Sequence, residues 1–112
     1  MLNIADNSIT NEGLRAIAAG LERAPSKELV SLNLSHNDLD GVGAVESLNC
    51  FLESSSNLQL LNLNENKIGN DGLELLSKAF NEGKSRLSRL YLASIGATAA
   101  GFKTLFMALK SN

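Results

Sequence analysis

Few side chains in this 112-residue sequence could carry nucleophilic, acid–base or metal chemistry. His36 is the only histidine and Cys50 is the only cysteine. We place His36 just after a predicted strand and Cys50 within a predicted helix of the opposite layer, so a cysteine–histidine nucleophile pair is not expected. Cys50 occupies a position that is small in every copy of a sequence repeat, and we interpret it as a packing residue; its equivalents are Gly20, Ala79 and Ala108.

His36 shares its own position in the repeat with two carboxylates, Asp6 and Glu65. An imidazole between carboxylates could bind a metal ion weakly or respond to pH, because histidine titrates near neutral pH. One histidine with two separated carboxylates is a poor ligand set, however, and a solvated surface is the favoured interpretation. The glycines recur at repeat spacing and form no phosphate-binding cluster. We therefore expect no metal site, no cofactor and no catalytic residue.

The composition is that of a globular domain, with 44% hydrophobic and 20% charged residues and a net charge of -2. A charge this small gives no reason to expect nucleic acid or an anionic membrane as a partner. No run of about 18 apolar residues is present, so a membrane-spanning helix is not expected. Residues 1–6 lack the segments of a secretory signal. The single cysteine favours a reducing compartment, and we expect a cytoplasmic protein.

A period of about 29 residues organises the whole sequence. The segment at residues 29–39 recurs at 58–68 and, more loosely, at 87–97. A partial copy precedes it by 30 residues, with Leu2, Ile4, Asn7 and Ile9 in the positions of Leu32, Leu34, Asn37 and Leu39. Glycines keep the same phase at Gly13, Gly43, Gly72 and Gly101. A fixed period of this length is typical of a stacked repeat array.

Each repeat is predicted to contain a strand followed by a helix. Leu32 and Leu34 alternate with polar residues, which indicates a strand with one buried face, and Leu73, Leu76 and Phe80 have helical spacing. We expect helices near residues 11–23, 41–54, 71–81 and 98–110, and their starts are signalled by the N-cap residue types Thr10, Asp40, Asn70 and Thr98. Units this short must pair their strands in parallel. Because a helix is wider than the strand spacing, the array curves with its strands on the concave side.

The repeated pattern Leu-x-x-Leu-x-Leu-x-x-Asn-x-Leu, followed by a glycine and a helix, resembles the leucine-rich repeat family. Its long period resembles the ribonuclease-inhibitor-like class of that family, and the resemblance covers essentially all 112 residues. It implies an α/β fold, a right-handed leucine-rich repeat solenoid with a parallel sheet on the concave side and α-helices on the convex side. We predict one domain, residues 1–112, with four repeats at about 1–28, 29–57, 58–86 and 87–112.

Members of that class include inhibitors, scaffolds, actin-regulatory proteins, Ran GTPase-activating proteins, sensor regions of NOD-like receptors and bacterial effectors delivered into host cells. The resemblance therefore implies protein–protein recognition. We expect a non-catalytic module that binds a protein partner, in the cytoplasm or, for a secreted bacterial effector, in the host cytosol. The alternatives are a GTPase-activating-type regulator and a purely structural segment of an array.

Two landmarks of the repeat have predicted structural roles. Asn7, Asn37 and Asn66 follow the strands, where their amides can bond backbone groups of adjacent turns as a ladder, and the in-phase glycines permit close approach or an unusual φ. Ile95 takes the asparagine position in the last repeat, so we expect the ladder to end there. Neither end carries a polar cap, which arrays normally need. We expect a piece of a longer array or protein, or ends that self-associate, with the strand at residues 1–5 as one exposed edge.

The strand side chains that leave the core form a small polar grid. Alternation places two pairs of residues side by side on neighbouring strands as the predicted partner-binding patch: Leu60 with Arg89, and Asn62 with Tyr91. Tyrosine and arginine are enriched at binding hot spots, although Tyr91 could equally serve to cover the end of the sheet. The wider concave surface adds Asn33, His36 and Glu65.

Overall fold

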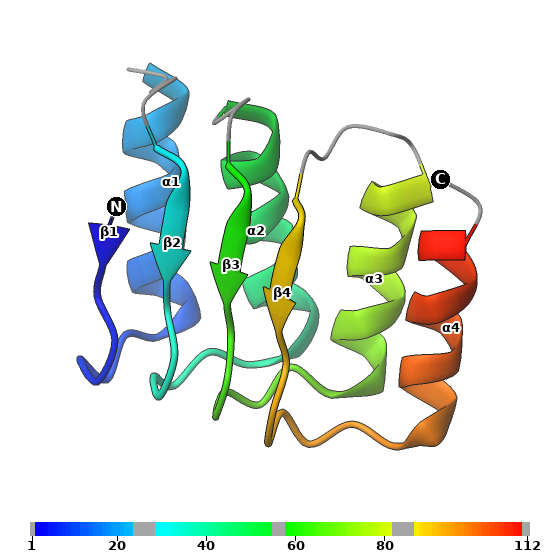
Figure 1. The fold of residues 1–112 in the computed structure, drawn as a ribbon. Helices are drawn as coiled ribbons and strands as arrows, with labels where there is room; N and C mark the ends of the chain where they lie inside the picture. The colour runs from blue at the N-terminus through cyan, green and yellow to red at the C-terminus, as the bar shows by residue number, and fades with distance from the viewer. Residues whose placement is uncertain (1, 24–28, 55–57, 82–86, 111–112) are drawn as a thin grey trace.

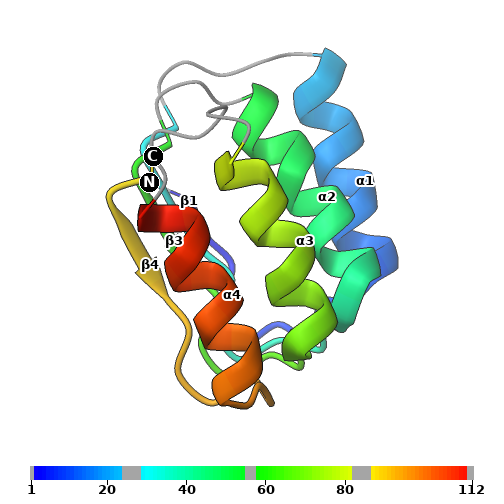
Figure 2. The same cartoon turned by 90° about the vertical axis from the view of Figure 1, so that its right-hand side faces the viewer.

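Four strands and four helices alternate along the chain. The computed structural model describes residues 2–23, 29–54, 58–81 and 87–110. The elements are β1 (Leu2–Asn3), α1 (Asn11–Arg23), β2 (Ser31–Asn33), α2 (Gly41–Ser54), β3 (Leu60–Asn62), α3 (Gly69–Asn81), β4 (Arg89–Tyr91) and α4 (Ala99–Lys110). The strands form one parallel sheet in the order β1-β2-β3-β4, and the helices lie in a second layer behind it (Figures 1 and 2). The predicted α/β solenoid is confirmed.

The core lies between the sheet and the helices. Leucines that alternate with polar residues in and just after the internal strands are 0% exposed: Leu32, Leu34, Leu61 and Leu63. Helix leucines in the same cluster, including Leu14, Leu48, Leu73 and Leu76, are also 0% exposed. Burying each such side chain contributes roughly 1.5–3 kcal/mol to the stability of the fold. The leucines of the strands and those of the helices therefore stabilise the same core layer. None of the helices in the described part of the chain is long and apolar enough to cross a membrane.

The helix boundaries follow the sequence predictions except at the starts of α3 and α4. Helices α1 and α2 have the predicted bounds, and α4 begins one residue later than predicted. Helix α3 begins at Gly69, two residues earlier than predicted, so the prediction that Asn70 is an N-cap is wrong. Gly69 adopts a φ of 67°, which glycine tolerates readily. The Asn70 amide instead bonds the next repeat, accepting from the Thr98 N–H and donating to Thr98 Oγ1, both at 2.9 Å.

Two sequence predictions fall outside what the structure describes. Cys50 lies in α2, but its side chain is outside the described part, so its packing role stays a prediction. Met1, the first residue of the strand predicted at residues 1–5, lies outside the described residues altogether.

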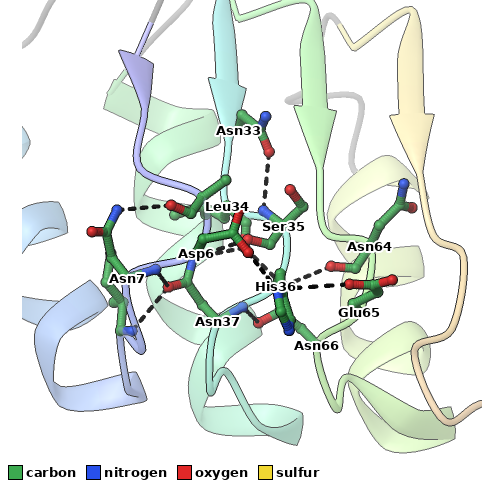
Figure 3. A network of polar contacts seen from close by, with 12 residues as sticks. Asp6, Asn7, Asn33, Leu34, Ser35, His36, Asn37, Asn64, Glu65 and Asn66 are labelled. Carbon is green, nitrogen blue, oxygen red and sulfur yellow. Dashed lines mark hydrogen bonds and ion pairs between the residues drawn. The ribbon is translucent and has the colours of Figure 1, made fainter.

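Asparagine side chains join each repeat to the preceding one (Figure 3). Asn66 Oδ1 accepts hydrogen bonds from the N–H groups of Asn37 and Leu39, each at 3.2 Å. Asn66 Nδ2 donates across the same boundary to the carbonyl of Leu34 at 2.8 Å, and also to two carbonyls of its own repeat. Asn37 makes the equivalent bonds to the first repeat. The predicted ladder is confirmed for Asn37 and Asn66, both of which are buried.

The ladder changes at both of its ends. Ile95 takes the asparagine position in the fourth repeat and is 2% exposed, so it packs in the core and offers no amide. Another asparagine joins the third and fourth repeats, because Asn64 Oδ1 accepts from the Ala93 N–H at 2.7 Å. Because the fourth repeat has no asparagine at this position, the predicted end of the ladder at Ile95 is confirmed. At the other end, in the first repeat, Asn7 Nδ2 donates to the carbonyl of Ala5, within the same repeat, at 2.9 Å.

The in-phase glycines allow close approach between neighbouring repeats. A Cβ at Gly43 would lie 2.9 Å from Nδ2 of Asn11 in the preceding repeat, and a Cβ at Gly101 would collide with the side chain of Asn70. The φ angles are positive at other glycines, including Gly41 and Gly69. Of the two explanations that the sequence left open, close approach is the one that the structure confirms.

Replacing Leu61 with Asp is expected to prevent folding, because the side chain is 0% exposed and an unpaired charge would be buried. Leu60→Asp is the matched control, since Leu60 is adjacent in the sequence but half-buried on the concave face. Far-UV circular dichroism should show loss of helical signal for Leu61→Asp and its retention for Leu60→Asp. A native-like spectrum for Leu61→Asp would show that the assigned register is wrong.

Replacing Asn66 with Ala should lower the free energy of unfolding by more than about 2 kcal/mol, because several buried backbone groups lose their partner at about 1–3 kcal/mol each. Asn3→Ala is the control, since Asn3 Oδ1 accepts an exposed bond from the Ala5 N–H and its loss should cost less than about 1 kcal/mol. Urea denaturation measures both values. Equal losses for the two variants would contradict a special role for the ladder.

Candidate functional site

Strand residues that alternate with the buried leucines form the concave face of the sheet. The register places Leu60 beside Arg89 and Asn62 beside Tyr91 on the adjacent strands β3 and β4, as the sequence predicted. Strands in a sheet lie about 4.8 Å apart, so these four residues form one continuous surface, which we call the β3–β4 patch. Asn33 lies beside Asn62 on β2 and extends this surface across a third strand.

Exposure differs within the β3–β4 patch. Tyr91 is 43% exposed and Arg89 is also exposed, whereas Leu60 and Asn62 are half-buried. Arg89 and Tyr91 on β4 therefore offer most of the accessible surface of the patch, and Leu60 and Asn62 on β3 are less accessible. A tyrosine next to an arginine combines apolar area, hydrogen-bonding groups and a positive charge in one place.

The asparagines of the concave face also hold the turns that follow the strands. Asn33 Oδ1 accepts from the Ser35 N–H and Asn62 Oδ1 accepts from the Asn64 N–H, both at 3.0 Å. Tyr91 is in the same row but has no amide to offer, and the turn after β4 is instead bonded by Asn64 of the preceding repeat. The sequence analysis treated Asn33 and Asn62 as surface residues only. An asparagine two residues before a turn is a known turn signal and could have shown their structural role.

His36 lies between Asp6 and Glu65 where the strands turn, and we call these three residues the His36 cluster (Figure 3). His36 Nδ1 donates to Asp6 Oδ1 and lies 3.9 Å from Glu65 Oε2. All three residues have left-handed backbones, with φ angles of 58°, 53° and 59° in chain order. This conformation is uncommon for residues other than glycine, and it presents equivalent side chains along one edge in successive repeats. The prediction that His36 lies between two carboxylates is confirmed.

The carboxylates change the acid–base behaviour of His36. The hydrogen bond to Asp6, the charge of Asp6 and then the charge of Glu65 raise the pKa of His36 above its ordinary value of 6.5. The cluster therefore favours the imidazolium form, and its net charge changes from one negative to two negative as His36 loses its proton. Across the described residues, no three side chains of metal-ligating type are arranged to hold a metal ion.

The single histidine makes this effect measurable, since one imidazole resonance reports it. An NMR titration should give a His36 midpoint above 6.5, Asp6→Asn should lower it, and Glu65→Gln should lower it less. Asparagine tolerates the left-handed backbone at position 6. Because the folded pKa is raised, the ion pair stabilises the domain below about pH 6.5 and this small effect is lost as pH rises through the folded pKa. A midpoint that does not respond to Asp6→Asn contradicts this account.

Comparison with known proteins finds a matching family model and several relatives of this chain. A family model described as Leucine Rich repeat matches residues 2–18, 27–46 and 54–77, more than half of the chain. NACHT, LRR and PYD domains-containing protein 13 of Homo sapiens is 35% identical over 99% of this chain and 10% of its own length. RAN GTPase-activating protein 2 of Arabidopsis thaliana is 39% identical over 69% of the chain and 14% of its own length. Ribonuclease inhibitor of Mus musculus is 29% identical over 97% of the chain and 24% of its own length.

The chain thus spans about a tenth of the length of the first of these relatives and about a quarter of the last. Similarity to these proteins supports a protein-interaction repeat module. The strand–helix units, the asparagine ladder and the matched segments together show that the chain belongs to the leucine-rich repeat family, in its ribonuclease-inhibitor-like class.

Proposed function

We propose that this domain binds a protein partner on its concave face, with the β3–β4 patch at the centre of the contact. The observation that carries the proposal is the exposure of Arg89 and Tyr91 on one face of β4. In the same row, Asn33 and Asn62 use their side chains to hold turns, whereas the turn after Tyr91 is bonded by another residue. Tyr91 is therefore available to a partner, and tyrosine and arginine are the residue types that most often carry binding energy.

The concave face is electrically asymmetric along the strands. Arg89 lies at the start of β4, whereas the His36 cluster lies beyond the ends of β1, β2 and β3. A complementary partner would present an acidic group to Arg89 and a basic group to the carboxylates of Asp6 and Glu65. Such complementarity fixes the orientation of a partner and its association rate more than its affinity. Binding through this edge would also respond to pH, because protonation of His36 reduces the negative charge of the cluster.

A GTPase-activating-type regulator is the second candidate, because RAN GTPase-activating protein 2 is 39% identical over 77 residues. The activity in that name belongs to the relative, which is covered over 14% of its length. A GTP-hydrolysis assay with purified small GTPases separates the candidates, since accelerated hydrolysis would favour the regulator over a simple binding module. A purely structural segment would neither accelerate hydrolysis nor retain a specific protein.

Affinity capture from cell extract identifies the partner. The native chain is compared with an Arg89→Ala/Tyr91→Ala double variant, and a protein that is retained by the first and lost from the second is the candidate partner. Retention of the same proteins by both chains would remove the β3–β4 patch from consideration.

With that partner in hand, Tyr91→Ala should weaken binding by more than about 1 kcal/mol, roughly fivefold in Kd, without unfolding the domain. Val42→Ala is the matched control, because Val42 is also 43% exposed but lies at the start of α2 rather than on the concave face. Isothermal titration calorimetry measures both affinities. Equal affinities for Tyr91→Ala and the native chain would exclude Tyr91 as an anchor.

A further inference from the structure

Asparagine side chains on the concave face use only one end of their amides. Asn33 Oδ1 and Asn62 Oδ1 each accept from the backbone N–H two residues further along, at 3.0 Å. A backbone N–H can only donate, so the amide oxygen must face the turn and Nδ2 must face away from it. Figure 3 shows this arrangement for Asn33, whose nitrogen lies on the side of the amide away from Ser35. Across the described residues, neither Nδ2 has a hydrogen-bond partner.

The ladder asparagines differ, because they use both ends of their amides. Asn66 Oδ1 accepts from two N–H groups, and its Nδ2 donates to the carbonyl of Leu34 at 2.8 Å. Asn66 is 2% exposed, whereas Asn33 and Asn62 are half-buried. Polar groups at such a surface are satisfied by water or by a partner. Two half-buried donors of fixed direction are therefore available to an acceptor that a partner brings.

The two donors lie next to each other on the internal strands of the described sheet. Asn33 of β2 pairs with Asn62 of β3, and we call these two residues the amide pair. Neighbouring strands are about 4.8 Å apart, and a carboxylate has two oxygens that only accept, so each oxygen can accept from one amide. Arg89 of β4 lies diagonally from Asn62 on the same face, within reach of a long side chain.

We propose that the partner on the concave face contributes an aspartate or glutamate side chain, whose carboxylate binds the amide pair with Arg89 as its charged neighbour. This inference rests on the proposed function, because it names the group that the partner brings to that face. A carboxylate is favoured over a neutral carbonyl because hydrogen bonds to an ionised group are about twice as strong. The turn bonds already fix both amides, so little conformational freedom is lost on binding.

The carboxylates of the domain itself limit where an acidic group can bind. Asn64 Oδ1 also accepts from a backbone N–H, at 2.7 Å, and its Nδ2 is another donor without a partner in the described part of the chain. Asn64 is followed directly by Glu65, however, and Asp6 lies along the same edge. Like charges repel, so an acidic side chain is directed away from Asn64 to the amide pair, nearer to Arg89.

The variant Asn62→Asp changes the donor and keeps the turn. An aspartate retains an oxygen for the N–H of Asn64, but it replaces the NH2 group with a negative oxygen. Asn3→Asp is the matched control, because it makes the same exchange where Asn3 Oδ1 accepts from the Ala5 N–H at 3.1 Å. Asn3 lies two strands from Asn62, about 10 Å away. That distance exceeds the screening length of about 8 Å at physiological salt.

NMR of the native chain tests the carboxylate directly, since each asparagine NH2 group gives its own signals. The probe is a hexapeptide of alternating glutamate and glycine with both ends blocked, and the comparison peptide has glutamine in place of glutamate. The glutamate peptide should shift the NH2 signals of Asn33 and Asn62 in a saturable way, with a Kd at least about threefold lower than that of the glutamine peptide. Asn62→Asp should abolish the shift at Asn33, and Asn3→Asp should leave it in place.

Two outcomes of this titration overturn the proposal. NH2 signals of the amide pair that do not move with the glutamate peptide, up to about 20 mM at physiological salt, exclude a carboxylate site there. Equal Kd values for the two peptides show that the amide pair accepts any carbonyl oxygen. Both comparisons use the native chain, so they stand whether or not a variant folds. Circular dichroism and urea midpoints establish that Asn62→Asp and Asn3→Asp are folded.

The partner identified by affinity capture separates this inference from the proposed function. Isothermal titration calorimetry should give a Kd for that partner about tenfold higher with Asn62→Asp, against less than about twofold with Asn3→Asp. A partner that is lost from the Arg89→Ala/Tyr91→Ala variant but unaffected by Asn62→Asp supports the binding face and overturns the carboxylate contact alone. Retention of the same proteins by the native chain and the double variant overturns the proposed binding face itself.

Discussion

The first three repeats are held to one another by the amides of two buried asparagines, Asn37 and Asn66, and the rest of the structure depends on those contacts. One Asn66 side chain accepts from two N–H groups of the preceding turn and donates to one of its carbonyls. Buried backbone groups without partners are costly, so the repeats are stable in one relative position. That position aligns the strands in parallel with constant register and brings the leucines of successive repeats into one layer.

The same turns determine which side chains reach a partner. Left-handed backbones occur three residues after the end of each strand, at Asp6, His36, Glu65 and Ser94. This conformation presents one polar side chain per repeat along the concave edge. Asn33 and Asn62 stabilise the turns from the strand side. Tyr91 replaces them in the fourth repeat, and Asn64 bonds that turn instead. A change of one residue in the repeat thus frees an aromatic side chain while the turn remains hydrogen-bonded.

Every boundary between the described repeats combines a leucine layer, an asparagine contact and a close approach at glycine.

The sequence by itself determined the repeat, the order of strands and helices, the strand register, the ladder at Asn37 and Asn66 and its end at Ile95. These follow from local periodicity, because a period of 2 or 3.6 residues decides which side of an element is buried. The candidate patch followed from the same alternation. Only the tertiary structure decided that Asn70 bonds Thr98 instead of capping α3, that Asn64 bonds the turn after Tyr91, and that Phe106 is exposed where its equivalents are buried. Each of the two asparagine contacts joins a side-chain oxygen to a backbone N–H that lies 28 or 29 residues further along the chain. The exposure of Phe106 depends on which elements pack against α4. The residue patterns within a single strand or helix carry no information on either point.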